Sequence, residues 1–122
     1  MITLEALRAY GANVDEGQAR CVKNEGLYLR LVGTLVKEPR FDELKQALES
    51  GDLTGAYEAA HALKGSLANL SLTPLSEPMA QLSDTLKARL QGVLPEGGEP
   101  DFGALLEKCV KAKEAFDAMA AE

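Results

Sequence analysis

The one histidine of the chain, His61, is the residue best suited to do chemistry in this sequence. A neutral imidazole is a good nucleophile and proton acceptor near neutral pH, and it can carry a group on a ring nitrogen. Lys64 follows about one helical turn later, where its ammonium can reach an anion held at the ring. Gly65 comes next, and its missing side chain leaves space for an object docking on the imidazole. These residue types indicate an imidazole that has both space and a cation beside it.

Each of the three residues also has an ordinary structural interpretation. A lone histidine is often incidental, a lysine on a helix is often only solvated, and a glycine can admit close packing of a neighbouring helix. The helical phase separates these readings, because the apolar positions repeat every three or four residues and form one stripe: Leu53, Ala56, Ala60, Leu63, Leu67 and Leu70. At ~100° per residue, His61 points roughly 130° away from the centre of this stripe. We therefore predict that His61 and Gly65 face outward, where a glycine that costs about 1 kcal/mol of helix stability has no packing reason.

Turn signals divide the chain into helical segments, and no stretch shows the two-residue alternation of strands. The predicted helices are residues 3–10, 15–23 and 25–50, one that follows Asp52 and runs to about Leu70, one from Thr73 or Ser76 to Leu90, and a last one beginning near Pro100 and Asp101. Pro39 should break the third segment, and Pro78 should disturb the first turn of the fifth. Gly51 can end one helix and Asp52 can cap the next. The fold class is thus all-α, an up-and-down four-helix bundle with a short helical N-terminal cap, in a single domain over residues 1–122.

Composition excludes several classes of function. The formal net charge is −6, and the 13 basic residues are scattered, which argues against a nucleic-acid partner. Cys21 and Cys109 lack the spacing of a zinc site, so we expect two buried thiols and no metal. The first residues do not form a signal peptide, and no stretch reaches the ~18 apolar residues of a membrane span. We expect a cytoplasmic protein with no membrane partner.

Residues 61–70, with the sequence HALKGSLANL, resemble the signature of histidine-containing phosphotransfer (HPt) domains. In that signature a histidine is followed by an apolar residue, a lysine, a glycine and a small residue, and the matching positions are His61, Leu63, Lys64, Gly65 and Ser66. The resemblance extends to the helices before and after and covers nearly the whole chain. It departs from the family at Ser71, where such domains usually have a glycine, and in a longer loop around Gly97 and Gly98.

The resemblance implies a phosphorelay protein. The neutral imidazole of His61, through Nε2, is expected to take a phosphoryl group from the aspartate of a response-regulator receiver domain and later pass it to another. The aspartate and the Mg²⁺ ion would belong to the receiver, so the chain itself needs no cofactor. It has no Gly-rich phosphate loop, and we expect a carrier rather than an enzyme with its own turnover. The expected partners are receiver domains, a hybrid sensor kinase or both, bound by a monomer.

The same resemblance points to residues beyond the histidine helix. In the family, a polar residue on the following helix often bonds the ring nitrogen that does not carry the phosphoryl group. By spacing this position is Ser83, where related domains often have glutamine, and Gln81 is a neighbour that could substitute. Lys87, one helical turn after Ser83, is a candidate second cation near the site. The alternative is that Lys87 is an ordinary exposed lysine of the helix.

Three other functions compete with the relay. The main one is a non-catalytic interaction module that binds receiver or kinase domains without carrying phosphate, which the intact His61, Lys64 and Gly65 argue against. A hydrolase using His61 as a general base would need a nucleophile or convergent carboxylates that the sequence does not indicate. A kinase dimerisation domain would normally be followed by an ATPase domain.

Overall fold

The computed structural model describes residues 2–92 and 102–121, and these residues form seven α-helices and one short 3₁₀ helix with no strand. The elements are α1 (Leu4–Tyr10), α2 (Val14–Arg20), α3 (Glu25–Thr34), η1 (Leu35–Lys37), α4 (Arg40–Ser50), α5 (Leu53–Asn69), α6 (Thr73–Gln91) and α7 (Phe102–Ala121). The all-α prediction is confirmed for this part of the chain. No helix among these residues is long and apolar enough to cross a membrane.

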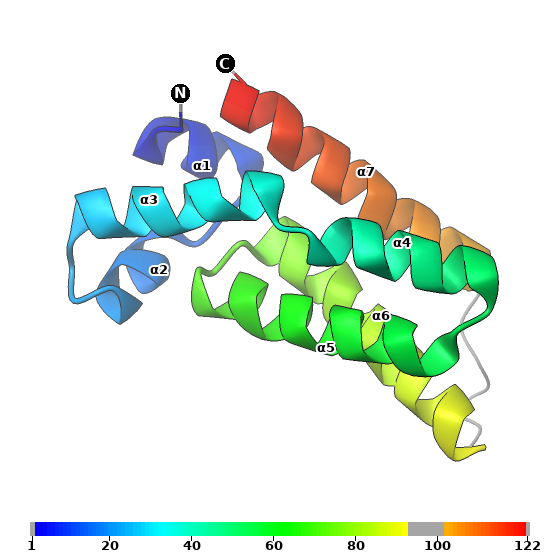
Figure 1. Cartoon of the computed structure of the whole chain (residues 1–122). Coiled ribbons are helices and arrows are strands. Elements are labelled where there is room, and N and C mark those ends of the chain that lie inside the picture. Colours follow the sequence, from blue (N-terminus) through cyan, green and yellow to red (C-terminus); the bar gives the residue numbers. More distant parts are fainter. Residues whose placement is uncertain (1, 93–101, 122) are drawn as a thin grey trace.

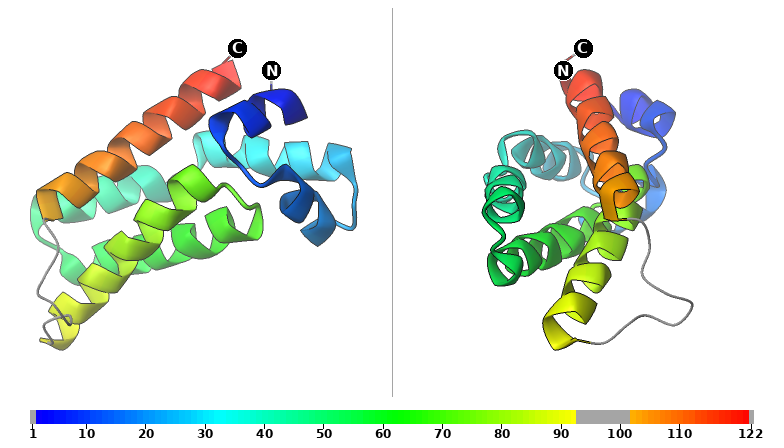
Figure 2. Two further views of the ribbon diagram at one scale, coloured as in Figure 1. Left: turned by 180° about the vertical axis from the view of Figure 1, so that it is seen from behind. Right: turned by 90° about the vertical axis from the view of Figure 1, so that its right-hand side faces the viewer.

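The helices α4, α5, α6 and α7 follow one another along the chain, and α5 is the helix that carries His61 (Figure 1). A short turn joins α5 to α6, so the two helices run antiparallel and pack along each other, while α4 packs on α5 and α7 packs on α6. The two views of Figure 2 show α1 beside the C-terminal half of α7, with α2 and α3 continuing around the same end. The helix that carries His61 therefore lies between α4 and α6.

Local chemistry explains where α4 and α5 begin and end. Pro39 separates the 3₁₀ turn η1 from α4, which confirms the predicted break. Gly51 ends α4 in the left-handed conformation with φ of 77°, and the Asp52 carboxylate accepts a hydrogen bond of 2.9 Å from the Gly55 backbone N–H. Both predicted caps are confirmed.

Other boundaries differ from the predicted ones. The second helix ends at Arg20 rather than at Lys23, because Val22 and Lys23 both adopt positive φ, 56° and 59°, which no α-helix accommodates. Pro78 does not lie in the first turn of its helix, since α6 begins at Thr73 and continues through it. The predicted start of the last helix at Pro100 and Asp101, and the loop around Gly97 and Gly98, lie outside the described residues.

The core confirms the predicted stripe on α5. Ala56, Ala60, Leu63, Leu67 and Leu70 are buried. Leu53, at the start of the stripe, is half-buried against the same core. Cys21 and Cys109 are buried free thiols, as expected, and burial raises the pKa of the Cys109 thiol to about 11, so that it stays protonated at neutral pH.

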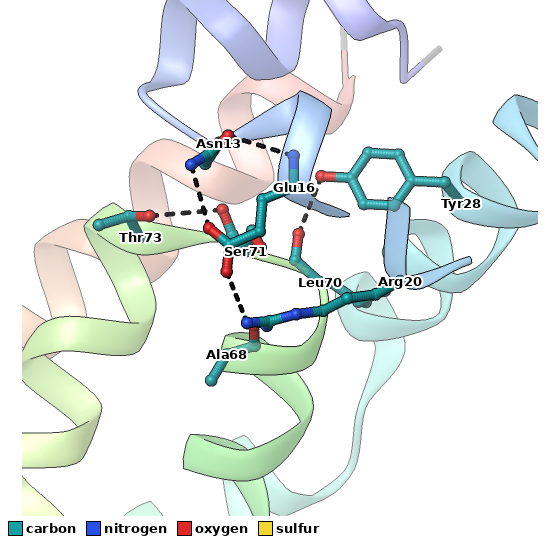
Figure 3. Close-up of polar contacts among 8 residues, drawn as sticks. All are labelled: Asn13, Glu16, Arg20, Tyr28, Ala68, Leu70, Ser71 and Thr73. Atoms are coloured by element: carbon teal, nitrogen blue, oxygen red, sulfur yellow. Dashed lines mark hydrogen bonds and ion pairs between the residues drawn. The ribbon is translucent and has the colours of Figure 1, made fainter. Parts of the chain in front are cut away.

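The C-terminal end of α5 is clamped by α2 and α3 (Figure 3). The Tyr28 hydroxyl donates a buried hydrogen bond of 2.9 Å to the Leu70 carbonyl, and the Arg20 guanidinium donates to the Ala68 carbonyl. Gly17 lets α2 approach this closely, because a Cβ there would lie 2.5 Å from the Tyr28 ring and 2.8 Å from the Leu70 oxygen. A glycine is therefore required for packing at this position.

Ser71 forms the turn between α5 and α6 and occupies the left-handed region with φ of 56°. Its carbonyl accepts a 2.9 Å hydrogen bond from the Asn13 backbone N–H, while its own buried hydroxyl has no hydrogen-bond partner among the described residues. This conformation explains why a glycine suits the position. The serine carries both the steric cost of a Cβ at positive φ and the cost of an unsatisfied polar atom.

We predict that Ser71→Gly stabilises the protein by about 1–2 kcal/mol, because it removes both costs while adding some chain entropy to the unfolded state. Ser71→Ala is the matched control, since it removes the hydroxyl and keeps the Cβ, and it should gain less. Urea denaturation monitored by circular dichroism measures both variants. A glycine variant no more stable than wild type would contradict this account of the turn.

Candidate functional site

His61 lies near the middle of α5 and is exposed, as its helical phase predicted. Gly65 and Ala68 follow it at spacings of four and three residues, and both are exposed too. On this face of the helix the imidazole stands above small residues. A partner could therefore bring its backbone close to the ring.

Tyr57 lies one turn before His61 on α5 and packs its ring against the imidazole. The two ring centroids are 5.5 Å apart, and the ring planes are inclined by 27°, which is a stacked arrangement. Tyr57 is itself half-buried against the hydrophobic core. Sequence analysis missed this residue, although its spacing of four from the histidine was a usable signal.

Lys64 forms an ion pair with Asp84 across the α5–α6 hairpin. Its Nζ atom lies 3.5 Å from Asp84 Oδ1, and the side chains are 39% and 72% exposed. An ion pair this exposed contributes only ~0.2–1 kcal/mol, so the lysine can exchange partners readily. Asp84 is a second residue that sequence analysis missed, because only the register of the hairpin brings it to Lys64.

Gly65 has no packing role among the residues that the structure describes. A Cβ built on it would meet nothing within 4 Å, whereas the same atom on Gly17 would collide with a ring and a carbonyl oxygen. Among the helices of residues 2–92 and 102–121, none needs a glycine at position 65 for close packing, which excludes that alternative for them. The open space lies one turn from His61, on the face where a partner would dock.

The three α6 residues that the family resemblance suggested near His61 differ in how far they are buried. Ser83 is buried, with 1% exposure, while Gln81 and Lys87 are exposed. Within the described part of the chain, none of them forms a hydrogen bond with the imidazole, so the structure does not bring Ser83 to a ring nitrogen. The functional roles of these three residues stay predictions.

An open groove of about 750 Å³ runs between α4 and α5 beside this face. Its lining is mostly polar: Arg40, Glu43, Gln46, Ala47, Ser50, Asp52, Gly55, Glu58, Ala59 and Ala62. Over residues 2–92 and 102–121, no group of three or more His, Cys, Asp or Glu side chains is arranged to hold a metal ion. The chemical features of the site are therefore His61 and its immediate neighbours.

The described residues form an all-helical fold, and the one histidine of the chain is exposed on it beside small residues that leave room for a partner. Residues 38–121 match the Hpt domain, and the chain belongs to this family. The matched region begins just before α4 and ends with α7, so it contains His61, Lys64 and Gly65. No curated protein and no solved structure gave a match to the chain.

The contrast between the two helical glycines gives a prediction. Gly65→Ala should stabilise the protein by up to about 1 kcal/mol, because alanine is the better helix former and its Cβ enters open space. Gly17→Ala should destabilise it, since Tyr28 or the Leu70 carbonyl must move. Thermal melts of the two variants test this directly.

A larger side chain at Gly65 tests the docking role. Gly65→Leu should keep the wild-type helicity and melting behaviour while lowering phosphoryl transfer with a receiver at least tenfold by blocking approach to His61. If the leucine variant unfolds, Gly65 is a packing residue. If the variant transfers at the wild-type rate, the open space has no docking role.

Proposed function

We propose that this protein carries a phosphoryl group on His61 in a two-component phosphorelay. On this proposal α4, α5, α6 and α7 form the up-and-down four-helix bundle of the phosphotransfer domain, and α1 to α3 form its N-terminal cap within a single domain over residues 1–122. The observation that carries the proposal is the exposed imidazole on α5, inside the matched Hpt region, with open space at Gly65.

The chemical step is an in-line substitution at phosphorus. The lone pair of His61 Nε2 attacks the phosphorus of an aspartyl phosphate, the new N–P bond forms, and the bond between phosphorus and the aspartate oxygen breaks. The aspartate leaves as a carboxylate with the bonding electron pair, and the imidazole gains positive charge while Nδ1 keeps its proton. Reversal of this step on a second receiver returns the neutral ring.

The proposal assigns most of the catalysis to the partner. The receiver provides the aspartate and the Mg²⁺ ion, which stabilises the charge of the transferring group, so the chain acts as a carrier without turnover of its own. The partners are receiver domains, alone or as part of a hybrid sensor kinase. We also propose that the protein works as a monomer in the cytoplasm, where such receivers are phosphorylated.

Phosphoryl transfer from a labelled receiver tests the proposal. Wild-type protein mixed with phosphorylated receivers of the same cell should acquire label that is lost in acid and stable in alkali, as expected of phosphohistidine. His61→Gln should acquire none while melting like the wild type. Absence of transfer from every receiver, with complexes still formed, would instead support the non-catalytic interaction module.

The Lys64–Asp84 pair gives a second test. We propose that Lys64 leaves Asp84 for the phosphoryl oxygens once His61 is modified, so Asp84→Asn should free the lysine and shift the equilibrium toward the phosphorylated carrier by up to about fivefold. Lys64→Met should shift it the opposite way, and combining the two changes should remove the effect of Asp84→Asn. Equilibrium labelling of carrier and receiver measures the ratio. An unchanged ratio in Asp84→Asn would show that the pair has no influence on the phosphoryl group.

A further inference from the structure

The imidazole of His61 has one defined contact within the described part of the chain. Neither ring nitrogen has a hydrogen-bond partner there, and the ring is exposed, so its rotamer is set by the stack with Tyr57 at a centroid distance of 5.5 Å. An exposed histidine without such a contact samples several side-chain rotamers. The stack therefore restricts the plane in which the imidazole ring lies.

Tyr57 is suited to hold another ring because it is itself held. Its side chain is partly buried and packs against the core. It precedes His61 by four positions on the same helix, the spacing at which side chains lie one above the other. The partly buried ring of Tyr57 thus positions the exposed ring of His61.

The stack also has an electrostatic consequence. When Nε2 attacks phosphorus, the imidazole gains positive charge, and an aromatic face within about 6 Å attracts a cation through the negative potential above its ring. Tyr57 presents its face to the imidazole at an inclination of 27°. The contact is therefore stronger for the charged ring than for the neutral one.

We propose that Tyr57 is a positioning residue for phosphoryl transfer, which holds the plane of the His61 ring and stabilises the ring as it becomes charged. This inference rests on the proposed function of His61. Aromatic pairs of this kind are expected to change a rate or population by about two- to tenfold. The aromatic ring of Tyr57 carries the effect, and its hydroxyl group is not needed.

The experiment compares Tyr57→Phe, which keeps the ring, with Tyr57→Leu, which keeps apolar volume and removes it. Transfer from a phosphorylated receiver is followed in single turnovers over a range of receiver concentrations. The leucine variant should lose two- to tenfold in the maximal rate with an unchanged half-saturating concentration, and the phenylalanine variant should match the wild type. Tyr57→Met serves as a second ring-free variant if the leucine variant melts early.

Two further measurements need no receiver. Ring-current shifts of the His61 ring protons in NMR spectra should be present in the wild type and Tyr57→Phe and absent in Tyr57→Leu. Phosphoramidate, a small phosphoryl donor, should modify His61 more slowly in the leucine variant; Nε2 forms the bond to phosphorus as the P–N bond breaks and ammonia leaves.

The outcomes separate the two proposals. If the wild type takes no phosphoryl group from any receiver, the relay fails, while the NMR and phosphoramidate results still decide the role of Tyr57. If the ring-free variants react as fast as the wild type with both donors, Tyr57 does not position His61. If Tyr57→Phe is as slow as Tyr57→Leu, the hydroxyl group acts instead of the ring face, and the inference is wrong.

Discussion

The burial of α5 between α4 and α6 is the interaction on which the site depends. Three small residues on α5, Ala56, Ala59 and Ala60, are buried and allow the flanking helices to come close, while Leu63 and Leu67 fill the space between them. Because both sides of α5 are covered, only a narrow strip of the helix remains open to solvent. His61 lies on that strip, ~100° around the helix axis from buried Ala60, so a shift of one residue toward the position of Ala60 would bury the imidazole.

The end of α5 connects this helix to the N-terminal part of the chain. The last turn of α5 contains no basic residue, and Arg20 of α2 supplies a cation by donating to the Ala68 carbonyl, which favours the negative end of the helix dipole. Tyr28 of α3 holds the next turn through its bond to Leu70. The segment before residue 38 lies outside the region matched to the family, yet it fixes one end of the site helix.

The sequence was sufficient to predict features that depend on short-range chemistry. The phase of α5, the break at Pro39 and the caps at Gly51 and Asp52 all follow from residue type and spacing, and the structure confirms them. The end of α2 was predicted three residues too late, because a β-branched Val22 at positive φ is rare and nothing nearby signals it. The Lys64–Asp84 and Arg20–Ala68 contacts depend on tertiary register, which residue spacing along one helix cannot provide.

Tyr57 and Ser83 show that residue spacing along the sequence was also insufficient to predict the contacts of the site. Tyr57 has the spacing of a stacking partner, but an aromatic residue at that spacing is equally compatible with a core position, and only the structure shows its ring against His61. Ser83 was placed by analogy with the family, and the structure buries it in the core. The register of α5 against α6, rather than the sequence spacing, decides which α6 side chains can face the ring.

Lys64, the cation one turn from His61 on the same helix, is paired with a carboxylate, which bears on the proposed role as a carrier. Lys64 is paired with Asp84, and Arg20, at the end of the same face, contacts Glu16 at 2.5 Å. A site with several unpaired cations would bind a phosphoryl group tightly and retain it, whereas exposed paired cations add only ~0.2–1 kcal/mol each. On the proposed function a phosphoryl group is accepted and then released, and such weak stabilisation would keep the carrier and its partners close in free energy. The pairing of Lys64 thus suits the proposed reversible transfer better than storage of the phosphoryl group.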